Sequence, residues 1–125
     1  MSAAGPKRSE RVAGRLRMEL MDMLLRGDIR DPAVAGVFVT AVRLSDDLRH
    51  ARIYVRSPQE AGPEARKAIL RGLQRAAGFM RRELSPRLQL KYLPELKFFW
   101  DEGVDEATRV EELLSDLRES GELSE

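Results

Sequence analysis

The chain has 125 residues, of which 42% are hydrophobic, and this size and composition are those of one globular domain. It contains no cysteine, which excludes disulfides and thiolate metal sites. The N-terminal stretch MSAAGPKRSER lacks the apolar run of a secretory signal, and no segment approaches the roughly 20 apolar residues of a membrane span. We therefore expect a cytoplasmic protein that does not bind a membrane.

The formal net charge of +1 hides an uneven distribution. Residues 101–125 contain ten acidic side chains against two arginines, a net charge of −8, so residues 1–100 carry +9. A basic body with an acidic tail is typical of nucleic-acid-binding proteins, although an unevenly charged, solvated surface gives the same count.

The first predicted element is a helix from Glu10 to about Arg26, which follows a disordered segment over residues 1–8. Ser9 is placed to cap its N-terminus, and Gly27 is placed to end it. One face of this helix carries apolar residues at helical spacing, namely Val12, Leu16, Leu20, Met23 and Leu24.

Two strands are predicted next, VFVTAVRLS over residues 37–45 and HARIYVR over residues 50–56, joined by the turn DDLR. Alternation in the first strand would put one set of side chains on a single face, namely Phe38, Thr40, Val42 and Leu44. The return strand alternates in the same way, with Ala51, Ile53 and Val55 on one face. The two strands form a hairpin.

Two helical segments and a third strand complete the domain. A helix runs from Glu64 to about Ala77, a second helical piece follows Gly78, and Pro86 is expected to distort or end that piece. The stretch PELKFFW, residues 94–100, predicts a strand. An acidic amphipathic helix comes last, with Val110, Leu113, Leu114 and Leu117 on one face. The element order α-β-β-α-α-β indicates an α+β fold.

No catalytic or metal-binding constellation stands out. His50 is the single histidine and lies at a hairpin turn, with no cysteine to help it hold a metal. Ser45, Asp46 and Asp47 could form part of a nucleophile set, but short polar residues at a turn are more simply explained by turn chemistry. Neither a P-loop nor a dinucleotide-binding motif is present. We expect a protein that is not an enzyme and needs no cofactor.

Basic side chains are the stronger functional signal. The candidates for contact with RNA phosphates lie on the first helix and on the two helical segments, with one before the last strand: Arg8, Arg11, Arg15, Lys67, Arg71, Arg75, Arg81, Arg82 and Lys91. Single rows of arginines on helices are usually solvated, but two rows here meet at Gly78. Phe79, Phe98 and Trp100 are predicted to lie in the core, which favours recognition of RNA shape and phosphates over base stacking.

Gly78 itself needs a reason, because glycine costs about 1 kcal/mol relative to alanine inside a helix. A kink at Ala76-Ala77-Gly78 would divide one helix into two and expose the amide end of the second helix. Such an end binds phosphate, and the missing side chain lets a nucleic-acid backbone approach closely. Tight packing of small residues on the sheet is the alternative explanation, and the two are compatible.

The element order is that of a type II KH-like domain, with a three-stranded sheet packed by helices. The stretches DPAVAGVFVTAVRLSDDLRHARIYV, RAAGFMRREL and LPELKFFWDE…TRVEELL resemble segments of the bacterial ribosome-binding factor A family, over roughly residues 8–117. In that family an Ala-x-Gly helix kink replaces the GxxG loop of ordinary KH domains. Here the kink corresponds to Ala76, Ala77 and Gly78.

The resemblance implies a monomeric, non-catalytic assembly factor that binds the immature 30S ribosomal subunit and its 16S rRNA. Members of the family assist late processing of that rRNA near its 5′ end, matter most in the cold, and act with or are released by ribosome-assembly GTPases. Two departures bear on the site. Gln89 stands where members often carry a basic residue, which implies a weaker contact there, and Pro86 falls within a helix that is usually continuous.

We expect a KH-like RNA-binding domain over residues 9–101, preceded by the disordered residues 1–8 and followed by an acidic helix and tail over residues 102–125. An alternative function is that of a protein-binding adaptor, in which the acidic C-terminal helix docks a partner through Leu113, Leu114 and Leu117, or folds back over the basic face. A small hydrolase is a third hypothesis, without a readable triad or metal set.

Overall fold

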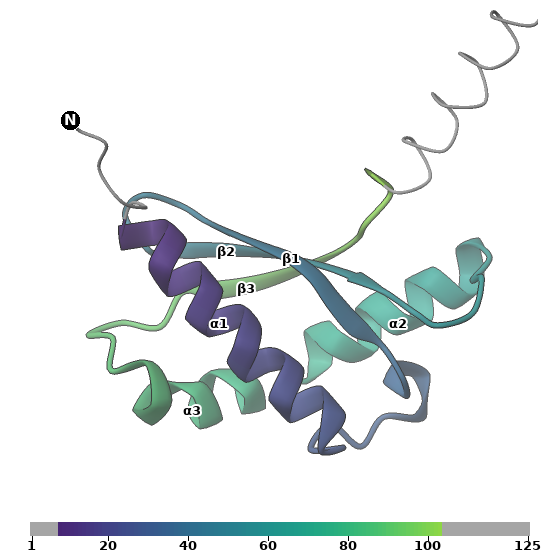
Figure 1. The fold of residues 1–125 in the computed structure, drawn as a ribbon. Coiled ribbons are helices and arrows are strands. Elements are labelled where there is room, and N and C mark those ends of the chain that lie inside the picture. The colour runs from purple at the N-terminus through teal and green to yellow at the C-terminus, as the bar shows by residue number, and fades with distance from the viewer. Residues whose placement is uncertain (1–7, 104–125) are drawn as a thin grey trace, which may run out of the picture.

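The computed structural model describes residues 8–103. Its elements in chain order are the helix α1 (Arg8–Leu25), the short 3-10 helix η1 (Pro32–Val34), the strands β1 (Phe38–Leu44) and β2 (His50–Arg56), the helices α2 (Pro63–Arg75) and α3 (Ala77–Leu88), and the strand β3 (Glu95–Trp100). Apart from η1, this is the predicted order α-β-β-α-α-β, and the predicted fold class is confirmed (Figure 1). Disorder was predicted for residues 1–8, but Arg8 already belongs to α1. Residues 1–7, and all but the first two residues of the predicted acidic helix and tail over residues 102–125, lie outside the described residues.

The three strands form one mixed sheet in the order β1-β2-β3. β1 and β2 pair antiparallel, as the short turn between them requires, whereas β2 and β3 pair parallel. A parallel pair needs a long crossover connection, and here α2 and α3 supply it. In Figure 1 the strands cross the upper part of the molecule and α2 and α3 lie beneath them.

Among residues 8–103, the helices bury one face of the sheet and leave the other, the open face, uncovered. In β3 the side chains of Leu96, Phe98 and Trp100 are buried, and those between them are exposed. The buried strand residues form a single core with residues of all three helices, including Leu16, Leu20, Met23, Leu73, Met80 and Leu84. Full burial of such a side chain contributes about 1.5–3 kcal/mol, so this packing holds the three helices on one face of the sheet.

A β-bulge in β1 changes which side chains face the core. Val39 pairs with Val55, but the next pair is Ala41 with Tyr54, so Thr40 is an extra residue in the strand. Both Val39 and Val42 are buried as a result. The prediction that Thr40 shares a face with Val42 by strict alternation is wrong, because the bulge shifts the alternation by one residue.

Several helix ends differ from the predicted ones, among them that of α2, which ends at Arg75 rather than at Ala77. Ser9 is a buried residue inside α1 rather than its cap, and α1 already includes Arg8. Pro86 does not end α3, which continues to Leu88 and closes at Gln89 with a left-handed φ of 53°. Proline so close to a C-terminus removes a single hydrogen bond of the last turns, and the helix tolerates it. Gly27 follows α1 with a φ of 74°, as expected of a terminating glycine.

Candidate nucleic-acid interface

The predicted interruption of the long helix is present at Ala76. α2 ends at Arg75 and α3 begins at Ala77, with Ala76 between them at φ −84° and ψ −4°. Its N–H donates to the carbonyls of Gly72 and Leu73, and its own carbonyl accepts the first bond of α3, from Met80 at 2.9 Å. The first N–H groups of α3 therefore lack acceptors within the helix and mark its positive end.

Gly78 lies in the exposed first turn of α3, and its backbone does not require glycine. Its φ is not positive, contrary to a tight bend at that residue. A Cβ built on Gly78 would meet only the Arg82 guanidinium, at 3.7 Å. Neither strain nor packing therefore explains this glycine. Because Gly78 has no side chain, the amide end of α3 is accessible at this position.

The glycine that packing does require is Gly72 in α2, which was not among the predicted site residues. A Cβ on Gly72 would lie 2.8 Å from Oδ2 of Asp31 and 3.1 Å from Cγ1 of Val34. Gly72 thus lets α2 approach the loop that contains η1. A glycine among helix formers was visible in the sequence, but its neighbour in the preceding loop was not.

Arg75 is already engaged by an acid at the interruption. Its guanidinium lies 2.6 Å from the Asp31 carboxylate, which also accepts the Ala33 N–H at 3.0 Å. The Ala33 hydrogen bond, followed by that of Arg75, holds the pKa of the Asp31 carboxyl below its usual value. This predicted phosphate contact thus has a competing anion inside the protein.

Arg71 and Arg82 are the predicted candidates at the interruption that have no ion pair among the residues the structure describes. Both are exposed, Arg71 on α2 and Arg82 on α3. The Arg82 guanidinium lies beside Gly78, so it and the amide end of α3 face the same space. Together they can bind one phosphate through charge-assisted hydrogen bonds.

Phe79 is 37% exposed rather than buried in the core, so that prediction is wrong. It lines a shallow hollow of ≈ 260 Å³ beside the interruption, together with Ile29 and Ala76. Phe98 and Trp100 are buried, as predicted.

Two other predicted RNA contacts, Arg15 and Arg81, form hydrogen bonds to backbone carbonyls within the fold. The Arg15 guanidinium donates to the carbonyl of Arg87 at 2.9 Å and so joins α1 to the end of α3. Arg81 donates to the carbonyl of Leu93 at 3.0 Å and fixes the loop before β3. Lys67 is exposed and lies 4.0 Å from Glu64, one turn earlier on α2.

Arg8 and Lys91 meet at a different place, far from Gly78. They line a hollow of ≈ 200 Å³ together with the turn residues Asp47 to Arg49 and the loop after α3. Lys91 lies 5.5 Å from the ring centroid of Tyr92. Arg11 is exposed on α1. Among the predicted candidates, Arg75 and Arg82 therefore lie at the interruption and Arg8 and Lys91 at the opposite end of α3, about 15 Å further along that helix, whereas Lys67 is near the start of α2.

Ser45 and Asp47 perform the turn chemistry expected of them. The Ser45 hydroxyl donates to the Asp47 carboxylate at 2.6 Å, and the Arg49 N–H donates to the same carboxylate. The serine hydrogen bond, more than that of Arg49, lowers the pKa of Asp47. Within residues 8–103 no group of three metal-ligating side chains converges, and no helix has the length and apolar character to cross a bilayer.

A second group of cations was missed in the sequence. Arg43, Arg52 and Lys97 are exposed on the open face of the sheet, one on each strand. Each occupies an alternating strand position, but their alignment depends on the strand register and on the bulge in β1.

The fold and this basic helix junction define a type II KH-like α+β domain, in which an interrupted helix pair stands in place of a GxxG loop. The profile of the ribosome-binding factor A family matches residues 8–114, and the chain belongs to that family. Ribosome-binding factor A of Sorangium cellulosum strain So ce56 is 46% identical over 123 residues, covering 94% of this chain and 96% of that protein.

Two structures extend the comparison. The crystal structure of ribosome-binding factor A from Thermus thermophilus matches with a TM-score of 0.61 at 27% identity, over 73% of this chain and 93% of that one. A homology model of the Thermus thermophilus protein, fitted into the cryo-EM map of a 30S–RbfA complex, has a TM-score of 0.59 at 27% identity. The match covers 74% of this chain and 93% of that one. The family is one of ribosome-binding factors and not a known class of enzyme.

Proposed function

We propose that this chain is an assembly factor that binds the immature 30S subunit and assists maturation of 16S rRNA near its 5′ end. Family membership over residues 8–114 supports this function, as does the 30S complex of the Thermus thermophilus relative. The observation that carries the proposal is the α2–α3 junction, where the amide end of α3 and the Arg82 guanidinium lie beside the uncovered backbone of Gly78.

In this proposal the junction binds rRNA backbone. The first N–H groups of α3 and Arg82 hold one phosphate, and Arg71 holds a neighbouring one. Arg75 joins them when phosphate displaces the Asp31 carboxylate. Arg8 and Lys91 extend the footprint at the far end of α3, and Arg81 supports it by fixing the loop before β3. The proposed mechanism consists of RNA binding alone, and no covalent bond of the RNA is made or broken.

Sedimentation with ribosomal subunits tests this function. The protein, which we expect to be monomeric, is mixed with small subunits from wild-type cells and with immature ones from assembly-defective cells, and we expect preferential retention on the immature particles. Equal retention on both, or none, contradicts the proposal. Assembly GTPases are the partners expected to release the factor, and adding such a GTPase with GTP to the retained complex tests that role.

The phosphate mechanism has its own test in the salt dependence of RNA binding. About five phosphate contacts to duplex RNA give a slope of about −4 to −5 in log affinity against log salt. Arg82→Gln is expected to reduce this slope by about one unit. Arg17→Gln removes one exposed charge from α1 and is the matched control, with the slope unchanged. A slope near zero for the wild-type chain excludes the phosphate mechanism.

A further inference from the structure

The open face of the sheet carries a row of three cations in register. Arg43 pairs with Arg52 between β1 and β2, and Arg52 pairs with Lys97 between β2 and β3. Adjacent strands lie about 4.8 Å apart, so the three side chains project from neighbouring positions on the same face of the sheet. Within residues 8–103 none of the three forms an ion pair. Like charges at directly opposed positions destabilise a sheet, so this row opposes folding unless a counter-charge arrives.

An aromatic pair lies directly beside the cationic row. Tyr54 opposes Phe99 between β2 and β3, with ring centroids 5.7 Å apart and planes tilted by 30°. Phe99 is 38% exposed, and Ala41, which opposes Tyr54 on its other side, is small. The two rings form an apolar surface at the middle of the sheet, next to three positive charges.

The acidic groups of this face lie at its two ends, and both have partners. At one end of the face, Oε1 of Glu95 lies 3.4 Å from Nδ1 of His50. Asp101 follows β3 at the other end and accepts a hydrogen bond from the Thr40 hydroxyl at 2.5 Å. The centre of the face is therefore cationic and aromatic, with no acid between the two rows.

The geometry points to this open face as a second RNA-binding surface, which holds a single-stranded segment with its phosphates on Arg43, Arg52 and Lys97 and its bases stacked on Tyr54 and Phe99. A linear row of cations complements the repeated charges of a phosphate chain, and the exposed Phe99 ring beside the half-buried Tyr54 ring offers the stacking that unpaired bases need. The inference rests on the proposed function only for the identity of the ligand as RNA.

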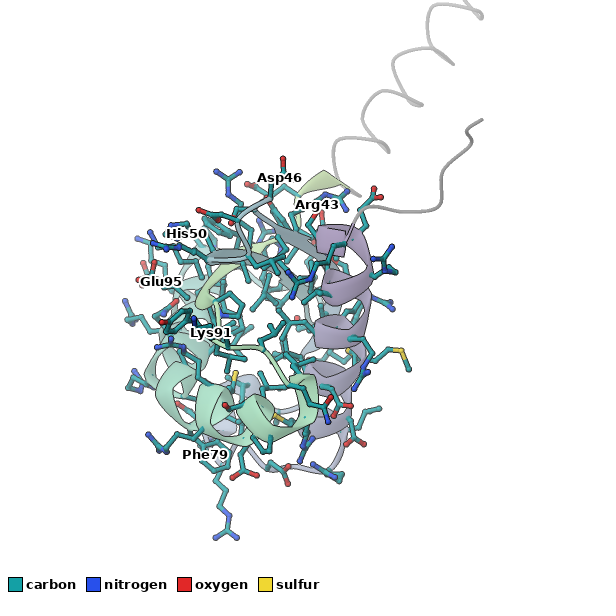
Figure 2. All side chains as sticks on the ribbon, turned by 90° about the vertical axis from the view of Figure 1, so that its left-hand side faces the viewer. Arg43, Asp46, His50, Phe79, Lys91 and Glu95 are labelled. Carbon is teal, nitrogen blue, oxygen red and sulfur yellow. The ribbon has the colours of Figure 1, made fainter. Side chains whose placement is uncertain are left out.

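This surface and the helix junction lie on opposite sides of the molecule. Figure 2 places Arg43 near the top of the view and Phe79, in the first turn of α3, near the bottom. The buried core lies between them. Each surface can therefore be altered without touching the other, and the two contacts can be measured separately.

Binding of two RNA probes to the full chain tests the inference. One probe is a fluorescein-labelled oligouridylate of about 10 nucleotides, within the site size of single-strand-binding surfaces. The other is an RNA duplex of the same length. The double variant Tyr54→Leu/Phe99→Leu keeps apolar bulk but removes both rings, and we expect it to weaken oligouridylate binding about 10-fold or more. Duplex binding is expected to change less than about 2-fold.

The cationic row is tested with Arg52→Gln/Lys97→Gln, which should lower the salt slope for the oligouridylate by about 1.4. Arg26→Gln removes one exposed charge at the end of α1, away from the strand row, and should leave this salt slope unchanged. Urea midpoints within error of wild type show that each variant is folded. In the wild-type chain, added oligouridylate should shift the amide NMR signals of β2 and β3.

Several results would overturn the inference. One is unchanged oligouridylate affinity in the Tyr54/Phe99 variant; another is a set of NMR shifts confined to α2 and α3. Shifts in β2 and β3 that occur only after deletion of residues 104–125 would mean that this face is not open to RNA in the full chain. Loss of a protein partner with RNA binding intact would assign the face to protein. Failure of the proposed function gives a different result from failure of this inference, because the wild-type chain would then show no preference for immature subunits.

Discussion

Gly72 and Gly78 lie on either side of the Ala76 interruption, yet they have opposite surroundings. Gly72 faces the Asp31 carboxylate and Val34 at distances that leave no room for a methyl group. Gly78 faces open space apart from the end of the Arg82 side chain. Packing therefore explains the first glycine, whereas the second is explained only in the proposed function, as access for a phosphate.

Alanine substitutions separate these two explanations. Gly72→Ala is expected to destabilise the protein by about 1–3 kcal/mol, since its methyl group overpacks the loop that contains η1. Gly78→Ala should keep or slightly raise stability, because alanine favours a helix by about 1 kcal/mol. Urea denaturation measures both effects. Gly78→Ala should nevertheless weaken RNA binding, because its methyl group covers the amide end of α3. Unchanged RNA affinity of this stable variant would reject the phosphate site at α3.

Asp31 makes stability depend on pH. The pKa of its carboxyl is lowered in the folded protein, first by the Ala33 N–H and then by Arg75. A carboxyl with a lowered folded pKa stabilises the fold above its unfolded pKa, and this stabilisation is lost as pH falls through the folded pKa. Asp31→Asn should therefore have a lower Tm than wild type at neutral pH. The two melting curves should converge below the folded pKa, and a constant difference at every pH would contradict this.

The same variant tests the competition between Asp31 and phosphate for Arg75. Asparagine can still accept the Ala33 N–H, but it carries no charge to hold the guanidinium. We expect Asp31→Asn to bind RNA more tightly than wild type at low salt, while Asp31→Asn/Arg75→Gln loses that gain. Fluorescence anisotropy with a labelled RNA measures both, and an equal gain in the two variants would show that Arg75 plays no part.

The helices α1 and α3 are joined by a half-buried ionic network around Arg87. Its guanidinium lies 3.1 Å from Glu19 and 3.7 Å from Asp22, both on α1. A double-mutant cycle with Arg87→Met and Glu19→Gln should give a coupling energy of about 0.5–1 kcal/mol, the upper range for a partly exposed pair. Urea denaturation of the wild type, the two single variants and the double variant measures this coupling energy. Strictly additive effects would show that the Arg87–Glu19 pair does not contribute to holding α1 on α3.

The features that could be predicted from the sequence are those set by interactions between residues close together in the chain. The periodicity of α1 and β2 is local, and the small residues around Ala76 indicate a break, so the element order and the interruption could be predicted. The bulge at Thr40 lies within an unbroken run of strand formers and leaves no local signal. Pairs such as Arg75 with Asp31 join residues far apart in the chain, and only the packed fold brings them together.

Across the whole molecule, charge is divided between a basic body and an acidic end. Residues 1–100 carry +9 and residues 101–125 carry −8. In the proposed function, the negative charge of residues 101–125 reduces the positive field that RNA meets as it approaches the basic body. Such an effect is long-ranged and is screened by salt, which distinguishes it from direct contact.

Deletion of residues 104–125 removes a net charge of −6 and raises the charge of the chain from +1 to +7. We expect this truncated protein to bind RNA several-fold more tightly than the full chain at low salt. The gain should fall toward unity at about 1 M salt, where the screening length is about 3 Å. Anisotropy titrations over a salt series measure the ratio of the two affinities. A gain that persists at high salt would point to displacement of the acidic segment from an RNA site, and a loss of affinity would show that this segment itself helps to bind.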